Sequence, residues 1–315
     1  MSFKRLKRAV FGVALAAAVG ASAALAGCTI ETGHPRAKIT VEFGGTEYVM
    51  EYKLYRNMYP QTVRHFIELA EAGFYDNTII HDYTSNDWYG GGYVYNQEAY
   101  ADAVSNNALD DYLNDPDYYK EDDYLTLFNS GALTPSVYKN YSSYDEDGNM
   151  TVSDSDAYHT LIGEFADNDH VIESGQRSAE YGSLKMFYTD KVIDNIADAH
   201  VYIKTGGGQV LEHDYEYNSA TSLFALQVGT SSSLSTSGYA TFAYLNSDAD
   251  VDVLDSLIEA IADYIDAEYN SDSDFTSSAT VEVDRTESIA EQATSVTYTV
   301  PEVAIIIKTV EITRY

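Results

Sequence analysis

Residues 73–93 read GFYDNTIIHDYTSNDWYGGGY, and this stretch decides how the rest of the sequence is interpreted. Its apolar run, Thr78 to His81, is typical of a β-strand, and the polar residues after it are typical of a loop. The run Gly90-Gly-Gly92 does not form a phosphate-cradling pattern before a helix, so a turn is the better interpretation. The stretch therefore predicts a strand that leads into a glycine-rich loop.

Upstream of this strand, the pattern predicts a hairpin and a helix. Residues 38–43 and 48–54 alternate apolar and polar side chains, as half-buried strands do, and Gly44-Gly45 between them is a turn signal. Pro60 opens a helix with apolar residues at helical spacing, and Gly73 closes it.

Downstream, short strands dominate. Residues 94–160 are rich in Asp, Tyr, Asn and Ser and read as a partly helical insertion, because their aromatic side chains can pack. A helix is predicted at about 251–264 and a polar loop at 270–279. Further strands are predicted at 161–165, 183–188, 200–204, 239–245 and 303–312. Many strands with two clear helices suit a closed β-barrel capped by helices at its ends.

The N-terminus predicts a lipoprotein signal peptide. Four cations within residues 4–8 precede an alanine-rich apolar segment at 9–24, which is too short to span a membrane stably. Residues 25–28, LAGC, match a lipobox, where a bacterial lipoprotein is acylated on cysteine. An ordinary signal peptide with a chance cysteine is the alternative. Cys28 is the only cysteine and stands at the one position that the motif requires.

The predicted organisation has three parts. Residues 1–27 form the signal peptide, residues 28–37 a lipid-anchored tether, and residues 38–315 one domain. The protein is expected outside the cytoplasm, anchored to the bacterial cell membrane by lipid on Cys28. With no second cysteine, no intrachain disulfide can form.

The charge of the processed chain excludes some partners. Removal of residues 1–27 leaves 14 basic and 50 acidic residues, a net charge of −36. Nucleic acid is not expected as a partner, because its phosphates need cations to neutralise them. Anionic lipid headgroups are disfavoured for the same reason, whereas cationic polypeptides are favoured.

Several segments resemble the cyclophilin-type peptidyl-prolyl isomerases. Pro60-Gln-Thr-Val63, Gly73-Phe-Tyr-Asp76, His81 and Gly91-Gly92 are similar to the family's P-x-T-V, G-x-Y-D, F-H-R and Q-G-G run, with the spacing from histidine to double glycine intact. Other similar segments follow in the family's order, and together they cover about half the chain. They are IGEF at 162–165, GSLKM at 182–186, AHVYI at 199–203 and GYATF at 238–242.

The resemblance implies a mainly β fold: a closed eight-stranded antiparallel β-barrel capped by two helices, with the insertion at about 94–160. It also implies isomerisation of X–Pro bonds without a cofactor, acting here on proline-containing polypeptides of exported proteins. It places a substrate-binding groove at His81, Asp82, Asp87, Trp88, Gly90, Met186, Phe187, Tyr188, His200, Tyr202 and Tyr239.

Most of these groove positions depart from the family's residues. Asp82 replaces the arginine after the strand histidine, Asp87 the pocket phenylalanine, and Gly90 the glutamine before the double glycine. Tyr239 is a residue that the family often has at its position. The remaining departures are Trp88 for methionine, Phe187 for alanine, Tyr188 for asparagine, His200 for glutamine and Tyr202 for phenylalanine.

The change at Asp82 bears directly on catalysis. Rotation about an X–Pro bond meets a barrier of about 18–20 kcal/mol, and in the family a guanidinium donates a hydrogen bond to the twisted amide. An ionised aspartate has no proton to donate and repels the substrate carbonyl. The loss of one preorganised donor costs roughly 3–4 kcal/mol of transition-state stabilisation. Catalysis is therefore expected to be weak or lost.

No other residue is assigned as the catalytic donor. Lys185 neighbours Met186 on a predicted strand, so the two side chains are expected on opposite faces. Arg64 is interpreted as a solvated residue of the first helix. His200 could donate a hydrogen bond in place of the glutamine, with a simple polar substitution as the alternative.

No metal or cofactor is expected. Residues 145–149, DEDGN, resemble part of a calcium loop but lack the full spacing and the terminal glutamate, so a hairpin turn is the better explanation. The seven histidines include no pair at ligand spacing.

Three functions are open at this point, because a fold does not determine a function. The protein is a weak prolyl isomerase, a non-catalytic peptide-binding or chaperone-like module, or a structural envelope protein whose insertion carries the interaction. Membership of the isomerase family is the best single description.

Overall fold

The computed structural model divides the chain into two compact units, Met1–Gly33 and His34–Tyr315, and the fold described below is that of the second unit. The described residues are 33–120, 143–144, 150–151, 164–165, 178–188, 200–204, 210–214, 220–230, 239–269, 271–283 and 294–315.

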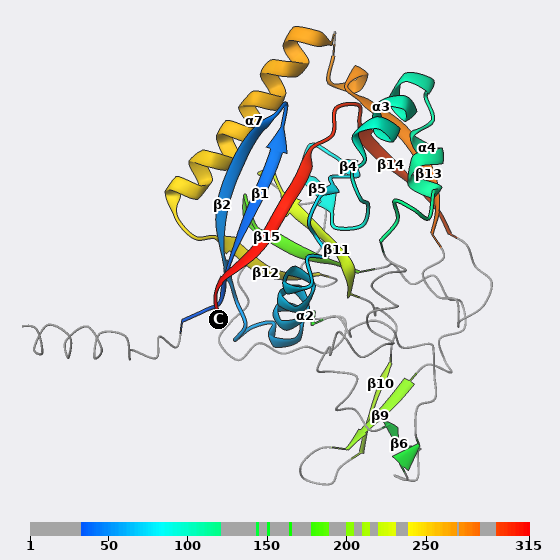
Figure 1. Cartoon of the computed structure of the whole chain (residues 1–315). Helices are drawn as coiled ribbons and strands as arrows, with labels where there is room; N and C mark the ends of the chain where they lie inside the picture. Colours follow the sequence, from blue (N-terminus) through cyan, green and yellow to red (C-terminus); the bar gives the residue numbers. More distant parts are fainter. Residues whose placement is uncertain are drawn as a thin grey trace, which may run out of the picture. The chain divides into compact units, whose positions relative to one another are not determined.

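A single antiparallel sheet forms the body of the fold (Figure 1). Its nine segments follow the order β3-β15-β1-β2-β12-β8-β11-β5-β4. In chain order they are β1 (Arg36–Phe43), β2 (Thr46–Leu54), β3 (Thr78–Ile79), β4 (Asp82–Tyr83), β5 (Asp87–Gly90), β8 (Leu184–Tyr188), β11 (Ala220–Gln227), β12 (Ala240–Leu245) and β15 (Ile306–Arg314). The mainly β fold class is confirmed.

The two ends of this sheet meet in one stretch of chain. β3 and β4 stand at opposite ends of the strand order, yet only Ile80 and His81 separate them in the sequence. The N–H of Ile80 donates to Ile305 O at 2.9 Å, and the N–H of His81 donates to Tyr89 O at 2.9 Å. The sheet thus curls round on itself. Counted as one strand, β3 and β4 leave eight strands, which is consistent with the predicted closed barrel.

Strand alternation produces the core. In β1 the side chains of Ala37, Ile39, Val41 and Phe43 are buried and their neighbours are half-buried, because successive side chains of a strand point to opposite faces. Full burial of one such valine, isoleucine or phenylalanine side chain contributes about 1.5–3 kcal/mol. β1 begins at Arg36, so the last two residues of the predicted tether lie in this strand.

Both predicted helices are present. α2 (Pro60–Glu71) packs against β15, and Gly73 follows it with φ +66, a conformation that suits glycine. α7 (Asp248–Glu268) is longer than predicted and packs along β2. It carries acidic side chains on its exposed turns and no lysine or arginine.

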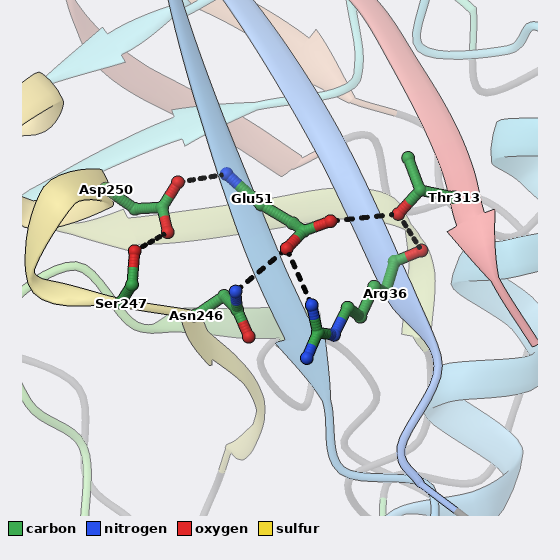
Figure 2. Close-up of polar contacts among 6 residues, drawn as sticks. All are labelled: Arg36, Glu51, Asn246, Ser247, Asp250 and Thr313. Carbon is green, nitrogen blue, oxygen red and sulfur yellow. Dashed lines mark hydrogen bonds and ion pairs between the residues drawn. The ribbon is translucent and has the colours of Figure 1, made fainter. Parts of the chain in front are cut away.

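A polar network ties the start of α7 to the sheet (Figure 2). The carboxylate of Glu51 in β2 accepts hydrogen bonds from Arg36 Nη1 at 3.0 Å and Asn246 Nδ2 at 2.8 Å. A third bond comes from Thr313 Oγ1 of β15 at 3.3 Å, while the N–H of Glu51 donates to Asp250 Oδ1 at 2.8 Å. The network is partly exposed, so its ion pair contributes about 0.2–1 kcal/mol and its role is to fix the helix in place.

The described part of the insertion contains two helices and two short strands. α3 (Gln97–Asn106) begins at Asn96, whose side chain accepts a bond from Ala99 N at 3.0 Å, and α4 (Leu109–Asn114) follows it. β6 (Ser143–Tyr144) and β7 (Met150–Thr151) pair antiparallel. Residues 145–149, the predicted hairpin turn, lie outside the described residues.

The predicted strand at 200–204 exists, but it does not belong to the main sheet. β9 (His200–Lys204) pairs with β10 (Val210–Asp214) and with β6 in a separate four-stranded sheet. The expectation that this strand contributes to the barrel was therefore wrong. Five apolar and polar residues in alternation define a strand, but they do not define its neighbour.

The predicted polar loop at 270–279 was also wrong in part. A 3-10 turn at Asp272–Asp274 leads into β13 (Thr276–Val283), which pairs with β14 (Thr294–Pro301) as a separate two-stranded hairpin. Its inward side chains join those of α3 and α4 in a second apolar cluster beside the main core. The members of this cluster include Ile79, Tyr93, Tyr100, Leu109, Leu113, Ala279, Val281, Tyr298 and Val300.

Candidate functional site

The stretch that follows the barrel strand is a hairpin, whereas the sequence predicted a loop. β4 and β5 pair with Asp82 opposite Tyr89 and Tyr83 opposite Trp88. Thr84 holds the turn, because its hydroxyl donates to Asp87 O at 2.7 Å and accepts from Asp87 N at 3.0 Å. This hairpin presents Asp82 and Asp87 at its two ends.

Asp82 lies against the hairpin β13–β14. Its carboxylate Oδ1 accepts a hydrogen bond from the N–H of Thr299 in β14 at 2.9 Å. Burial raises the pKa of Asp82 above its ordinary value of 3.8, against the opposing effect of that hydrogen bond. The side chain predicted to replace the family's arginine accepts a hydrogen bond from backbone 217 residues further along the chain.

The neighbouring His81 is also covered. Its side chain is 1% exposed, and its ring packs edge-on against Tyr93 at 4.8 Å and Tyr298 at 4.9 Å between centroids. Tyr298 precedes Thr299 in β14 and is itself buried. One strand of the hairpin β13–β14 thus contacts both His81 and Asp82, the residue predicted at the family's arginine position.

Asp87 and Lys185 form a buried ion pair. Lys185 Nζ lies 2.9 Å from Asp87 Oδ1, and the two side chains are 1% and 0% exposed. They come from β8 and β5, the two neighbours of β11, in which Ala225 stands opposite Lys185 and Gln227 stands opposite Asp87. Burial lowers the pKa of the Lys185 ammonium, and the charge and hydrogen bond of Asp87 oppose this effect.

Lys185 was expected on the face opposite Met186, away from the predicted groove. The expected alternation with Met186 is confirmed, but Met186 is the one in the barrel core, at 0% exposed. Lys185 lies on the opposite face, together with Asp87. The sequence did contain a signal for this ion pair: a lysine and an aspartate each occur beside apolar or aromatic residues. Lysine and aspartate are seldom fully buried unless they are paired.

Three other predicted groove residues lie in the interior. Trp88 is 2% exposed and stacks on Tyr83 with centroids 5.2 Å apart. Met186 belongs to the same core cluster. A Cβ on Gly90 would lie 2.9 Å from Ile307 Cδ1 and 3.0 Å from Ile80 Cδ1, so this position also faces packed side chains. These residues pack in the core and do not line an open groove.

Gly91 shows why the glycine run is needed. Its φ is +88, and a Cβ there would lie 2.6 Å from the carbonyl oxygen of Ser222 in β11. Both the backbone conformation and the close approach exclude other residues. Glycine at this position therefore allows the chain that follows β5 to approach the backbone of β11 closely.

The remaining predicted residues are placed only in part. Tyr239 is half-buried and packs against the core just before β12. Phe187 and Tyr188 lie in β8, but their side chains are outside the described part of the structure. His200 and Tyr202 lie in β9 of the separate sheet, and their side chains are likewise not described. Cys28, the predicted lipidation site, lies outside the described residues.

Neither a metal site nor a membrane-spanning helix is present among the described residues. No group of three or more histidine, cysteine, aspartate or glutamate side chains there could hold a metal ion. No helix among the described residues has the length and apolar character needed to cross a membrane.

The comparisons with known proteins agree with the topology. A family model described as cyclophilin type peptidyl-prolyl cis-trans isomerase/CLD matches residues 38–276. No curated protein matches the sequence. The match ends at Thr276, so all but the first residue of the hairpin β13–β14 lies beyond it.

Two solved structures of a cyclophilin type peptidyl-prolyl cis-trans isomerase from Cryptosporidium parvum are similar to this chain. The first has 13% identity and a TM-score of 0.36, and covers 89% of this chain and 98% of its own. The second, in the presence of the dipeptide Ala-Pro, has 13% identity and a TM-score of 0.37, and covers 89% and 99%. From the family match over most of its length, the chain belongs to the cyclophilin-type peptidyl-prolyl cis-trans isomerase family.

Proposed function

We propose that this protein is a lipid-anchored, extracytoplasmic member of its family that binds polypeptide segments of exported proteins, and that isomerase chemistry by the arginine route is weak or lost. One observation carries the proposal. The residue at the arginine position, Asp82, is an acceptor bonded to Thr299 N at 2.9 Å beneath β14.

The chemistry of the reaction gives this observation its weight. A twisted X–Pro amide is stabilised by a hydrogen-bond donor at the prolyl nitrogen, and a carboxylate offers none. Removal of one preorganised donor lowers a rate by about 10² to 10³ in other enzymes. Here the charge is reversed as well, and the carboxylate is already bonded to the N–H of Thr299.

The second altered position supports the same proposal. The family's pocket phenylalanine would hold the proline ring, whereas Asp87 is engaged in a buried ion pair with Lys185 at 2.9 Å. The nearby lysine does not replace the missing arginine, since its ammonium is held by Asp87 away from solvent.

The binding half of the proposal rests on charge and location. A processed chain with 14 basic and 50 acidic residues attracts cationic segments of unfolded or extended polypeptides. The lipobox at residues 25–28 would hold the domain at the membrane surface, where exported chains emerge.

The test of the catalytic half is exchange NMR on a short X-Pro peptide. The processed lipoprotein in detergent should not accelerate cis–trans exchange above empty micelles, whereas a family member with the arginine should do so in the same assay. The variant Asp82→Arg should remain inactive as well, because β14 still covers the position. Clear acceleration by the unmodified protein would overturn the loss of chemistry.

The test of the binding half uses matched peptides. A proline-containing peptide with several lysines should bind, and its affinity should fall as salt is raised. The same peptide with glutamates in place of the lysines should not bind. Equal binding of both peptides, or of neither, would contradict the proposed role.

A further inference from the structure

The pair Asp87–Lys185 brings an amine and a carboxyl group into contact inside the protein. Lys185 Nζ and Asp87 Oδ1 are 2.9 Å apart, so the amine nitrogen is held beside the carboxyl group that it would attack. Both groups are held by strands of one sheet, β8 and β5, so their approach is fixed by the register and does not depend on a loop. The geometry resembles a bound reactant pair more than a surface salt bridge.

The surroundings of the pair are buried, and this burial lowers the pKa of the Lys185 ammonium. The adjacent positions of this face, Ala225, Gln227 and Thr241, are 0%, 2% and 1% exposed. Burial of this kind disfavours isolated charges, and a proton that passes from the ammonium to the carboxylate leaves an amine and a carboxylic acid. An uncharged lysine is a nucleophile, and a protonated carboxyl group has a better leaving group than a carboxylate.

A buried acceptor stands beside the pair. Gln227 is directly opposite Asp87 in the register of β5 and β11. Its Nε2 donates to Gly229 O at 3.1 Å, while among the described residues its Oε1 is buried without a hydrogen-bond partner. A new N–H donor at this position would satisfy an atom that the ion pair leaves unsatisfied.

The position in the chain gives the pair a structural role. Asp87 lies just before the chain enters the insertion, and Lys185 lies 98 residues later, just after it returns to the barrel. A covalent link there would close a loop around the whole insertion. Cys28 is the only cysteine, so a disulfide cannot perform this task.

We propose that Lys185 and Asp87 form an intramolecular amide bond in the folded protein. Lys185 Nζ attacks Asp87 Cγ, a C–N bond forms, the C–O bond to the protonated hydroxyl breaks, and one water molecule leaves. No atom is oxidised or reduced. The amide N–H remains as a donor beside Gln227, and the two buried charges disappear.

Peptide mapping of the full-length protein tests this directly. Trypsin releases the fragment 65–120, which contains Asp87, and normally cleaves after Lys185 to give 178–185 and 186–191. An amide on Lys185 blocks that cleavage. The expected product is 65–120 joined to 178–191, lighter by one water than the sum of the two separate peptides.

The matched control is Lys185→Arg, which keeps the positive charge at the same place but has no amine to form this bond. Its digest should contain 65–120 unlinked, and its intact mass should show no loss of water. If Lys185→Arg does not fold, the map of the unmodified protein still decides. Recovery of free 65–120, 178–185 and 186–191 from that protein, at full mass, would overturn the proposal.

Discussion

Two opposing effects of the surroundings act on the pKa of Asp82. Burial against β14 disfavours its charged form, while the N–H of Thr299 stabilises it. Burial is the larger effect, so the pKa of Asp82 in the folded protein is raised above 3.8. A carboxyl group of this kind binds its proton more tightly in the folded state than in the unfolded state, which makes stability depend on pH.

The variant Asp82→Asn should reveal this dependence. The stability that Asp82 contributes is fully present below its unfolded pKa near 3.8 and is lost as the pH rises through the raised folded pKa. Asparagine keeps an oxygen to accept the bond from Thr299 but does not titrate. The unfolding free energy of the wild type, minus that of Asp82→Asn, should therefore fall as the pH is raised from about 4. Urea unfolding of both proteins at several pH values measures this difference in free energy. A difference that rises with pH would contradict the raised pKa of Asp82.

The first helix depends on a cap from a distant segment. The residue before α2, Tyr59, makes no side-chain capping bond. Glu164 supplies it instead, with Oε2 accepting from Thr62 N at 2.8 Å and both oxygens 3.1 Å from Gln61 N. A carboxylate at a helix N-terminus satisfies free N–H groups and interacts favourably with the helix dipole.

Removal of this cap should destabilise the protein measurably. Glu164→Ala should lower the unfolding free energy by about 1–2 kcal/mol, and Glu164→Gln by less, because the amide keeps one acceptor oxygen. Chemical denaturation measures both. Arg64→Ala is the control on the same helix: it removes an exposed pair with Glu68 and should cost only about 0.3–0.5 kcal/mol. If Glu164→Ala is no more costly than this control, the cap does not stabilise α2.

At the scale of the whole molecule, repulsion among the many negative charges lowers the stability of the folded protein. The chain carries 50 acidic against 18 basic residues. The helix α7, for example, has acidic side chains along its full length, including the C-terminal turn, where the helix dipole is also negative. Such repulsion opposes the compact state and is screened by salt.

Salt should therefore stabilise the protein. The screening length falls from about 30 Å at 0.01 M to about 3 Å at 1 M, so the melting temperature should rise by several degrees over this range. Sodium and potassium chloride should act alike, since the effect requires no specific cation site. A melting temperature that falls with salt, in scans at matched protein concentration, would show that attractive ion pairs outweigh the repulsion.

The sequence by itself determined the elements whose patterns are local. The alternation in β1 and β2, the helical spacing after Pro60 and the family segments around His81 were enough to predict these two strands, the first helix and a mainly β barrel, because residues two or four apart lie on one face of an element. The strand β11 was not predicted, and the residues of β4 and β5 were expected in a loop. The hairpin β13–β14 was missed since its buried residues, Ala279 and Val281 among them, are few and small in a run of serine and threonine.

Only the tertiary structure decided what surrounds the site. The sequence predicted Asp82 in a loop, whereas it opens the strand β4; its partner Thr299 is 217 residues away, and the partner of Asp87 is 98 residues away. It also placed Trp88 and Met186 in a groove, whereas the register turns both into the core. The physical reason is that a local pattern specifies which residues share a face, whereas strand pairing specifies which face is buried and what covers it.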